Sequence, residues 1–270
     1  MFLNSPRRLL NQQQVKNQFD RAAATYDSAA GLQRKMGESL QDELRTLGLP
    51  KDIKLIDLGC GTGELLRQLE QDGYTSLYGL DLSSSMIEVA KTKAPSVDFL
   101  HAPIESVPVG DSKFDVVISN AAIQWCDTET AACEIARILK PGGHLLLNSF
   151  VHGTLRQWDE AFVACGVASR VHPLATSKET ESAFASAGFQ ITAIAERVAT
   201  SSFASVTPMF SSIRKLGATN ATTSRKQSIT RSEYLAIREH FQEQVGVAER
   251  VDLDFVWVQL CAQKWLSDQH

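Results

Sequence analysis

Residues 55–64 read LIDLGCGTGE, a glycine-rich loop between a short apolar run and a helical pattern. Gly59 and Gly61 allow positive φ angles and let a ligand approach the backbone without a clash against a Cβ atom. The amides at the start of the following helix would point at that ligand. A dinucleotide-binding loop, G-x-G-x-x-G, has its third glycine one residue later than Gly63, and Glu64 would repel a pyrophosphate. The stretch therefore predicts a strand, a loop and a helix that bind a ligand without phosphate groups.

Two carboxylates accompany this loop. Asp57 stands near the end of the first apolar run, where it can face an ammonium group of the ligand. Asp81 ends the next apolar run, at the spacing of about 20 residues that is typical of a carboxylate binding a ribose diol. A glycine loop with two carboxylates suits a nucleoside that carries a cationic amino-acid tail. We therefore expect the ligand to be S-adenosyl-L-methionine.

Apolar runs and helical patterns alternate along most of the chain. The runs typical of strands are Ile53–Leu58, Ser76–Leu80, Val97–His101, Phe114–Ser119, His144–Phe150, Phe189–Val198 and Leu253–Lys264. The helical patterns are Glu64–Gln71, Ser84–Lys93, Thr128–Leu139, Thr154–Cys165, Lys178–Ala187, Pro208–Leu216 and Arg231–Val245. This alternation predicts an α/β fold, in which βαβ units form a parallel sheet with helices on both faces. Residues 141–143, Pro-Gly-Gly, are expected to end a helix before the fifth strand.

The segments outside this alternation divide a single domain, residues 1–270, into parts. Asn11–Leu44 looks helical and precedes the first strand, so we expect residues 1–48 to form a helical cover over a core of residues 49–200. Residues 201–232 are rich in Ser, Thr and Ala and interrupt the alternation as an insertion. Residues 233–270 would then supply the final helix and strand.

The composition excludes several classes of protein. With 43% hydrophobic and 21% charged residues among 270, the chain resembles globular rather than disordered proteins. No run reaches the ~18–20 apolar residues of a membrane span, and the first residues lack the apolar core of a signal peptide. The five cysteines include no Cys-x-x-Cys pair, and the six histidines show no metal-ligand spacing. We therefore expect a cytoplasmic protein without a disulfide framework or a metal site.

Charge is distributed unevenly along the chain, whose net charge is −4 from 27 basic and 31 acidic residues. Residues 1–19 and 201–232 contain no acid. Their basic residues are Arg7, Arg8, Lys16, Arg214, Lys215, Arg225, Lys226 and Arg231. Without these eight, 19 basic residues remain against the 31 acidic ones, so the rest of the chain is strongly acidic. The two basic segments are either solvated loops or surfaces that receive an acidic partner.

Four motifs together resemble the seven-stranded, Rossmann-like class I methyltransferases, which use S-adenosyl-L-methionine. They are residues 57–63 (DLGCGTG), 80–86 (LDLSSSM), 114–117 (FDVV) and 139–144 (LKPGGH). The cofactor-binding residues that this resemblance implies, besides Asp57, Asp81 and the three loop glycines, are Cys60, Leu82, Met86, Ile104, Glu105 and Asn120. Asn120 follows the fourth strand and would lie near the methionine end, because strand carboxyl ends line the crevice of open α/β sheets.

The adenosine end departs from the pattern of the family at one position. The resemblance implies that Leu82 and Met86 pack around the adenosine, and that Ile104 and Glu105 border the adenine. The family often carries an acid two residues before Glu105, which accepts a hydrogen bond from the adenine amino group. This chain has Pro103 there. Recognition of the adenine then depends on Glu105 or on backbone groups.

Three further segments resemble the malonyl-acyl-carrier-protein O-methyltransferases of biotin synthesis, and extend the resemblance to nearly the whole chain. They are residues 15–36, 119–125 (SNAAIQW) and 213–220 (IRKLGATN). The family implies methylation of the free carboxylate of a malonyl thioester. Tyr26 would close the site as a catalytic residue, and Gln33, Gln124 and Trp125 would bind the substrate. Arg214 is our candidate to hold the carboxylate through its planar fork, and a solvent-facing role for it remains open.

Several functions remain open at this point. The implied partner is an acyl carrier protein, with malonyl-coenzyme A as the alternative, and we expect no nucleic acid or membrane to be involved. The acceptor could instead be another small carboxylic acid such as aconitate, or a quinone precursor. A module that binds S-adenosyl-L-methionine without turnover is a further alternative, and a nicotinamide dehydrogenase is disfavoured by the position of Gly63 and by Glu64. His152 and His172 are weaker candidates to reach the site.

Overall fold

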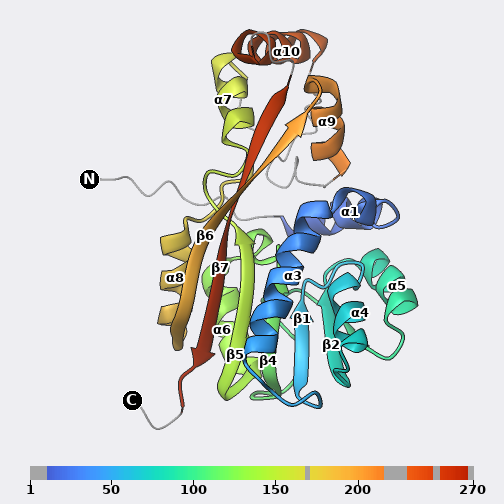
Figure 1. Ribbon diagram of the computed structural model, residues 1–270, viewed down its shortest axis with the longest axis vertical. Helices are drawn as coiled ribbons and strands as arrows, with labels where there is room; N and C mark the ends of the chain where they lie inside the picture. Colours follow the sequence, from blue (N-terminus) through green and yellow to red (C-terminus); the bar gives the residue numbers. More distant parts are fainter. Residues whose placement is uncertain (1–10, 168–170, 216–229, 246–249, 267–270) are drawn as a thin grey trace.

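The computed structural model describes residues 11–167, 171–215, 230–245 and 250–266, without the side chains of residues 214, 215, 244 and 245. Its centre is a seven-stranded sheet in the order β3-β2-β1-β4-β5-β7-β6 (Figure 1). The strands are β1 (Lys54–Leu58), β2 (Ser76–Asp81), β3 (Asp98–His101), β4 (Phe114–Asn120), β5 (Leu139–Phe150), β6 (Phe189–Phe203) and β7 (Val251–Lys264). The predicted Rossmann-like α/β class with seven strands is confirmed.

The first five strands are parallel, as the βαβ alternation predicts. Strand β7 lies between β5 and β6 and runs antiparallel to both, so the sheet is mixed. Because Asp57 pairs with Gly79 of β2 and with Ile118 of β4, the carboxyl ends of β1, β2 and β4 lie side by side. Asp57, Asp81 and Asn120 thus meet at one edge of the sheet.

Helices cover both faces of the sheet and bury an apolar layer on each. The helices of the described part are α1 (Gln12–Ala22), α2 (Tyr26–Ala29), α3 (Gly31–Thr46), α4 (Glu64–Gln71), α5 (Ser84–Lys93), the 3-10 turn η1 (Ile123–Trp125), α6 (Thr128–Ile138), α7 (Arg156–Ala164), α8 (Ser177–Ser186), α9 (Val206–Lys215) and α10 (Arg231–Val245). One layer joins Leu40 of α3 and Leu66 of α4 to Leu55 of β1. The opposite layer joins Ile135 of α6 to Phe184 of α8.

The amino-terminal segment expected to be helical over Asn11–Leu44 is helical, and it is divided into three helices. Residues 23–25 form a turn between α1 and α2, and Ala30, between α2 and α3, has a ψ angle of 31°. These breaks let α1 contact α5 while α3 packs against β4 and β5. An unbroken helix could not follow both directions. The short helix α2, between α1 and α3, carries Tyr26 and Asp27 to the glycine loop, where both line a pocket with Gly61.

The start of β5 also differs from the expectation. Helix α6 ends at Ile138, before residues 141–143, and the strand already begins at Leu139. The backbone of Leu139 is extended, with φ −76° and ψ 140°, and it pairs with Phe114 of β4. The pairing then shifts register before it resumes at His144, so Pro-Gly-Gly forms an irregularity inside the strand rather than a separator.

Strands β6 and β7 run past the ends of the other strands, to α7, α9 and α10 (Figure 1). A third apolar cluster forms there from side chains such as Trp158 of α7, Met209 of α9 and Phe241 of α10. The insertion predicted after Phe189–Val198 therefore lies between the last two strands. None of the helices described here is long and apolar enough to cross a membrane.

Candidate active site

The glycine loop turns tightly between β1 and α4, and its glycines differ in what surrounds them. Gly59 has φ 76°, and a Cβ atom there would lie 2.3 Å from the Cβ of Ala122. Gly61 has φ 54°, but a Cβ atom there would meet nothing within 4 Å. Gly63 is the N-cap of α4 and is packed against Ala90. Close packing thus requires Gly59 and Gly63, whereas Gly61 borders open space into which a ligand fits.

Asp81 holds this loop in place. One carboxylate oxygen accepts from the Gly61 amide at 2.9 Å, and the other accepts from the Ser83 amide at 2.7 Å. Burial raises the pKa of Asp81, although these two backbone hydrogen bonds act against the shift. A carboxylate offers about four acceptor positions, so two remain for a ligand such as a diol. The side chain is 9% exposed and borders a pocket.

Asp57 has fewer hydrogen-bond partners than Asp81. Its side chain is 2% exposed, and its Oδ1 atom has no hydrogen-bond partner. Burial, reinforced by the charge of Asp81, raises the pKa of Asp57 to about 8. A buried carboxylate without a partner is unfavourable unless a cation or a donor reaches it. The position therefore suits the ammonium group of a ligand.

Three adjoining pockets meet at this edge of the sheet, and we name each after one lining residue. The Met86 pocket, of about 640 Å³, is lined by Asp81, Leu82, Met86, Pro103, Ile104, Glu105, Trp125 and others. The Asp57 pocket, of about 580 Å³, is lined by Tyr26, Gln33, Asp57, Cys60, Thr62, Asn120 and others. The His172 pocket, of about 600 Å³, is lined by Phe19, Tyr26, Gln33, Gln124, Trp125, His172 and others.

Tyr26 borders all three pockets. Its ring packs edge-on against Phe19, with ring centroids 6.4 Å apart. Burial, followed by the charges of Asp81 and Asp27, raises the pKa of Tyr26 to about 12. The hydroxyl therefore keeps its proton at neutral pH and can donate a hydrogen bond, but cannot act as a base.

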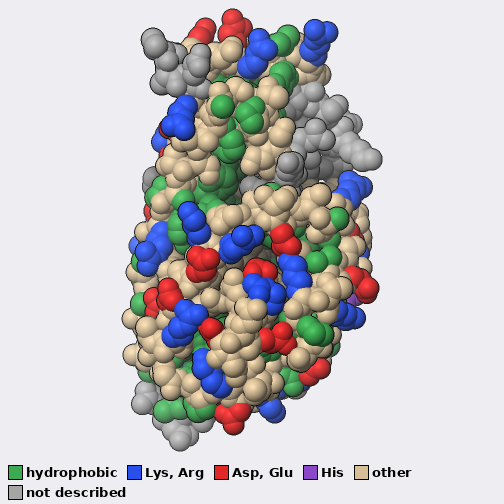
Figure 2. Space-filling model, turned by 45° about the vertical axis from the view of Figure 1, so that its right-hand side comes forward, with side chains coloured by type: hydrophobic (Ala, Val, Ile, Leu, Met, Phe, Trp, Pro, Cys, Tyr) green, Lys and Arg blue, Asp and Glu red, His purple; other side chains and the backbone are tan. Residues whose placement is uncertain are grey.

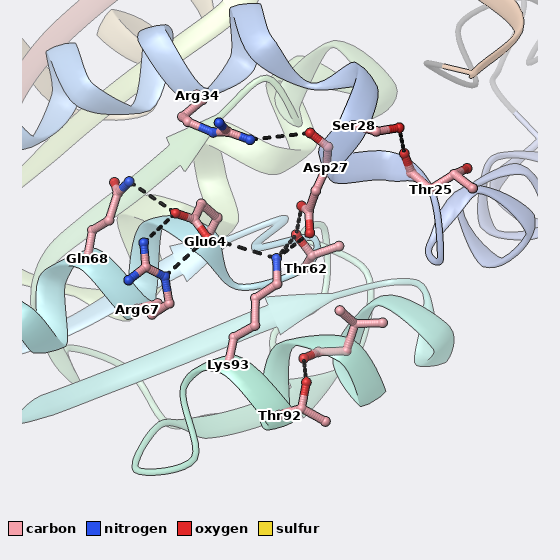
Figure 3. A network of polar contacts seen from close by, with 11 residues as sticks. Thr25, Asp27, Ser28, Arg34, Thr62, Glu64, Arg67, Gln68, Thr92 and Lys93 are labelled. Atoms are coloured by element: carbon pink, nitrogen blue, oxygen red, sulfur yellow. Dashed lines mark hydrogen bonds and ion pairs between the residues drawn. The ribbon is translucent and has the colours of Figure 1, made fainter.

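A polar network fastens the turn that carries Tyr26 to the core (Figure 3). Asp27 accepts from the Thr62 hydroxyl at 2.7 Å and from the ammonium group of Lys93, which comes from the end of α5. Although burial acts in the opposite direction, the hydrogen bonds from Lys93 and Thr62 hold the pKa of Asp27 below its usual value. A second contact joins Asp20 of α1 to the hydroxyl of Ser83 at 2.6 Å.

Sequence reasoning missed Asp20, Asp27, Thr62 and Lys93. The partners of Asp27 lie 35 and 66 residues away along the chain, so no local spacing could have indicated them. Glu64, which was expected to repel phosphate, instead pairs with Arg67 at 2.6 Å. The carboxylate thus belongs to the same paired network in Figure 3.

The residues expected to bind substrate, Gln33, Gln124 and Trp125, line the His172 pocket together with Tyr26. Asn120 donates to the carbonyl oxygen of Gln33 at 2.8 Å, and the Oε1 atom of Gln33 is buried without a partner. Trp125 stands between two aromatic neighbours: its ring centroid lies 5.8 Å from that of Phe19 and 5.7 Å from that of His172. His172, only a weak candidate from the sequence, thus lines the site.

Some expected residues do not join these pockets. Gly63 shapes the loop, but is not among the lining residues of the three pockets. The backbone of Arg214 lies in α9, and its side chain lies outside the described residues. His152 is exposed. Within the described ranges, no group of three or more His, Cys, Asp or Glu side chains could hold a metal ion.

Charged side chains of both signs lie on the face drawn in Figure 2, where Lys and Arg are interspersed with Asp and Glu over the middle of the molecule. Within the network of Figure 3, Lys93 pairs with Asp27 and Arg67 pairs with Glu64. Paired charges of opposite sign produce little net field around them.

Comparison with protein families and with proteins of known name adds independent findings. The model of a methyltransferase domain family matches residues 56–147. A malonyl-acyl-carrier-protein O-methyltransferase of Methylococcus capsulatus is 30% identical over 88% of this chain and 88% of its own length. One of Erwinia pyrifoliae is 31% identical, over 86% of this chain and 87% of its own. A biotin biosynthesis bifunctional protein of Cellvibrio japonicus is 31% identical over 82% of this chain, but only 44% of its own length.

Solved structures share the fold at low sequence identity. A putative methyltransferase of Bacillus halodurans superposes with a TM-score of 0.62 at 15% identity, over 84% of this chain and 99% of its own. A [4+2]-cyclase superposes with a TM-score of 0.61 at 20% identity, over 95% of this chain and 97% of its own. Proteins named for different reactions therefore share this architecture, and the fold alone does not identify the reaction.

Proposed function

The chain belongs to the malonyl-acyl-carrier-protein O-methyltransferase family, and we propose that it methylates the free carboxylate of a malonyl thioester held by an acyl carrier protein. The product would be the methyl ester, formed at an early step of biotin synthesis. The similarity to two relatives of this name, along more than four fifths of both chains, is the observation that carries the proposal.

The residues present fit S-adenosyl-L-methionine as methyl donor. The unpartnered, buried carboxylate of Asp57 suits its ammonium group, and the free acceptor positions of Asp81 suit its ribose diol. Leu82 and Met86 supply apolar contacts for the adenosine, and the open space at Gly61 lets a ligand approach the backbone. The donor supplies a methyl group on a positively charged sulfur. We propose no metal in this reaction.

The reaction places modest demands on the protein. A carboxylic acid of this kind is ionised at neutral pH, so it needs no general base before it attacks the methyl carbon. This agrees with Tyr26, whose raised pKa makes it a donor rather than a base. The task of the site is alignment, which can supply about 7–11 kcal/mol in well-oriented reactions, and exclusion of water from two opposite charges.

On the acceptor side, we propose that Tyr26 orients the carboxylate while Gln33, Gln124 and Trp125 shape the pocket that receives it. The Asp57 and His172 pockets share Tyr26 and Gln33, which supports a passage of the acceptor from the second pocket towards the first. Arg214, expected from the sequence to hold the carboxylate, remains our proposal for that role.

The direct test is a mass measurement. Purified protein is incubated with S-adenosyl-L-methionine and malonyl-acyl carrier protein, and the carrier protein should gain the mass of one methyl group. Cleavage of the thioester should release the methyl group from the carrier protein together with the malonyl group, because the methyl ester is formed on the malonyl carboxylate. Methylation of aconitate or of a quinone precursor, without methylation of the malonyl thioester, would instead support those alternatives. Binding of the donor without any turnover would support a binding module.

A further inference from the structure

One residue that lines the His172 pocket carries a hydrogen-bonding atom without a partner. His172 lines this pocket together with Tyr26 and Gln33, and its Nδ1 atom is buried without a hydrogen-bond partner. The surroundings are largely apolar and include Trp125, Phe150 and Leu174. A buried polar atom without a partner is unfavourable, so a ligand that supplied one would bind more tightly.

The protonation pattern of His172 follows from its other contacts. Its Nε2 atom lies 3.0 Å from the carbonyl oxygen of Gln124. A carbonyl oxygen only accepts, so Nε2 must carry the proton. The ring is stacked on Trp125 with an interplanar angle of 12°, which fixes its plane. Burial lowers the pKa of His172 against the opposing influence of the Gln124 carbonyl, so the ring is neutral and Nδ1 is an acceptor.

The malonyl group itself cannot satisfy this acceptor. An ionised malonyl thioester carries a carboxylate, a methylene and a carbonyl, and none of these has an N–H or O–H group to donate. The nearest donor on a carrier-bound or coenzyme-bound thioester is the amide N–H of the pantetheine arm, two carbons beyond the sulfur. The two ends of the malonyl thioester therefore need opposite hydrogen-bonding partners. The carboxylate needs hydrogen-bond donors, and the amide of the arm needs a hydrogen-bond acceptor.

We propose that Nδ1 of His172 accepts a hydrogen bond from this amide N–H, and so makes His172 a specificity-determining residue for thioesters on a pantetheine-type arm. Gln124 acts through His172, because its carbonyl oxygen fixes the tautomer that leaves Nδ1 free to accept. The proposal rests on the proposed function and identifies which part of the acceptor is recognised.

The experiment compares two small acceptors with three proteins. Malonyl-N-acetylcysteamine keeps the amide, whereas S-butyl malonyl thioester has a chain of similar reach without it. His172→Leu removes the acceptor atom, and His172→Asn retains an oxygen near the position of Nδ1. We expect His172→Leu to lower kcat/KM about three- to tenfold for the amide-containing acceptor, mainly through KM. For the S-butyl acceptor we expect less than about a twofold change, since no hydrogen bond is lost.

His172→Asn should restore most of the preference of the wild-type protein for the amide-containing acceptor. His152→Leu, at an exposed histidine, serves as the matched control and should leave both acceptors unaffected. Equal losses on both acceptors, or a wild-type protein that prefers neither, would overturn the proposal. The comparison of the two small acceptors with the wild-type protein does not depend on the folding of any variant. Methylation of neither thioester by the wild-type protein would overturn the proposed function itself, and this proposal with it.

Discussion

The two buried carboxylates, Asp57 and Asp81, have different surroundings although they lie at the same edge of the sheet. Asp81 accepts two backbone hydrogen bonds, whereas one oxygen of Asp57 has no partner. Each is therefore suited to a different part of one ligand. Replacement of Asp81 should mainly affect the binding of S-adenosyl-L-methionine, whereas replacement of Asp57 should change how the stability of the protein depends on pH.

For Asp81, we expect Asp81→Ala to weaken donor binding at least about tenfold, because hydrogen bonds to a charged group contribute about 1.5–3 kcal/mol each. Titration calorimetry measures this directly. Asp81→Asn is the useful companion, since its side-chain oxygen can still accept from the Gly61 amide and hold the loop. Unchanged binding by Asp81→Ala would show that the ribose is held elsewhere.

For Asp57, the raised pKa predicts how stability depends on pH. The pKa is near 3.8 in an unfolded chain and about 8 in the folded protein, so the folded state favours the protonated form. Its contribution to stability is complete below pH 4 and is lost as pH rises towards 8. Asp57→Asn should therefore become more stable relative to wild type between pH 4 and pH 8. Urea unfolding at several pH values, without added donor, measures this, and a constant difference would refute it.

For Tyr26, we expect Tyr26→Phe to lower turnover at least about tenfold, while the melting temperature changes by only a few degrees. The ring and its packing against Phe19 are retained, and only the donor at the meeting point of the three pockets is lost. Rate measurements with saturating donor, alongside thermal unfolding, separate the two effects. Normal turnover with a large loss of stability would make Tyr26 a packing residue.

At the scale of elements, α1 and α2 form a cover that the polar contacts of two carboxylates, Asp20 and Asp27, hold on the core. The Asp27 contacts reach both the glycine loop and the end of α5, and the Asp20 contact reaches the start of α5. The cover therefore depends on α5, which also contributes Met86 to the pocket beneath it. Ordering of the cover and occupation of the site should be linked.

We expect Lys93→Met to weaken donor binding about two- to fivefold, because the ion pair with Asp27 is partly exposed and such pairs contribute at most about 1 kcal/mol. Asp27→Asn should have a similar effect, and the double variant should be little worse than either single one. Arg156→Met, which breaks an exposed pair on α7, is the control. Fully additive effects in calorimetry would mean that the two residues do not act together.

At the scale of the whole molecule, the distribution of charge along the chain predicts where an acidic carrier protein would dock. The chain outside residues 1–19 and 201–232 is strongly acidic and should repel such a partner. We predict that reversal of Lys215, Arg225 and Lys226 to Glu raises KM for malonyl-acyl carrier protein several-fold. KM for malonyl-coenzyme A, whose contact is smaller, should change much less.

The docking prediction comes from the sequence alone, since the side chain of Lys215 and the whole of Arg225 and Lys226 lie outside the described residues. The effect should depend on salt, because ions screen the charges: the difference between the changes in KM for the two substrates should shrink as ionic strength rises. A matched reversal of three exposed lysines of the core provides the control, at Lys51, Lys91 and Lys178. Equal effects of the first reversal on both substrates would exclude a docking role.

Much of this molecule is determined by local sequence. Periodicity predicts the seven strands and most helices, because a buried strand or an amphipathic helix shows its pattern within a few residues. Glycine spacing, with Asp57 and Asp81, predicts the donor site, because the ends of adjacent parallel strands necessarily meet at one edge of the sheet. The confirmed α/β class and the family of the chain were both accessible from these motifs.

Only the tertiary structure decided the features that depend on partners distant in the chain. The helical segment expected over Asn11–Leu44 divides into α1, α2 and α3, because α1 contacts α5 while α3 packs on the sheet, and neither contact can be recognised from the local sequence. Asp27 holds α2 on the core through its contacts with Thr62 and Lys93. His172 is held at its pocket by its contacts with Gln124 and Trp125. Spacing along the chain does not encode such contacts, because packing of whole elements brings them together.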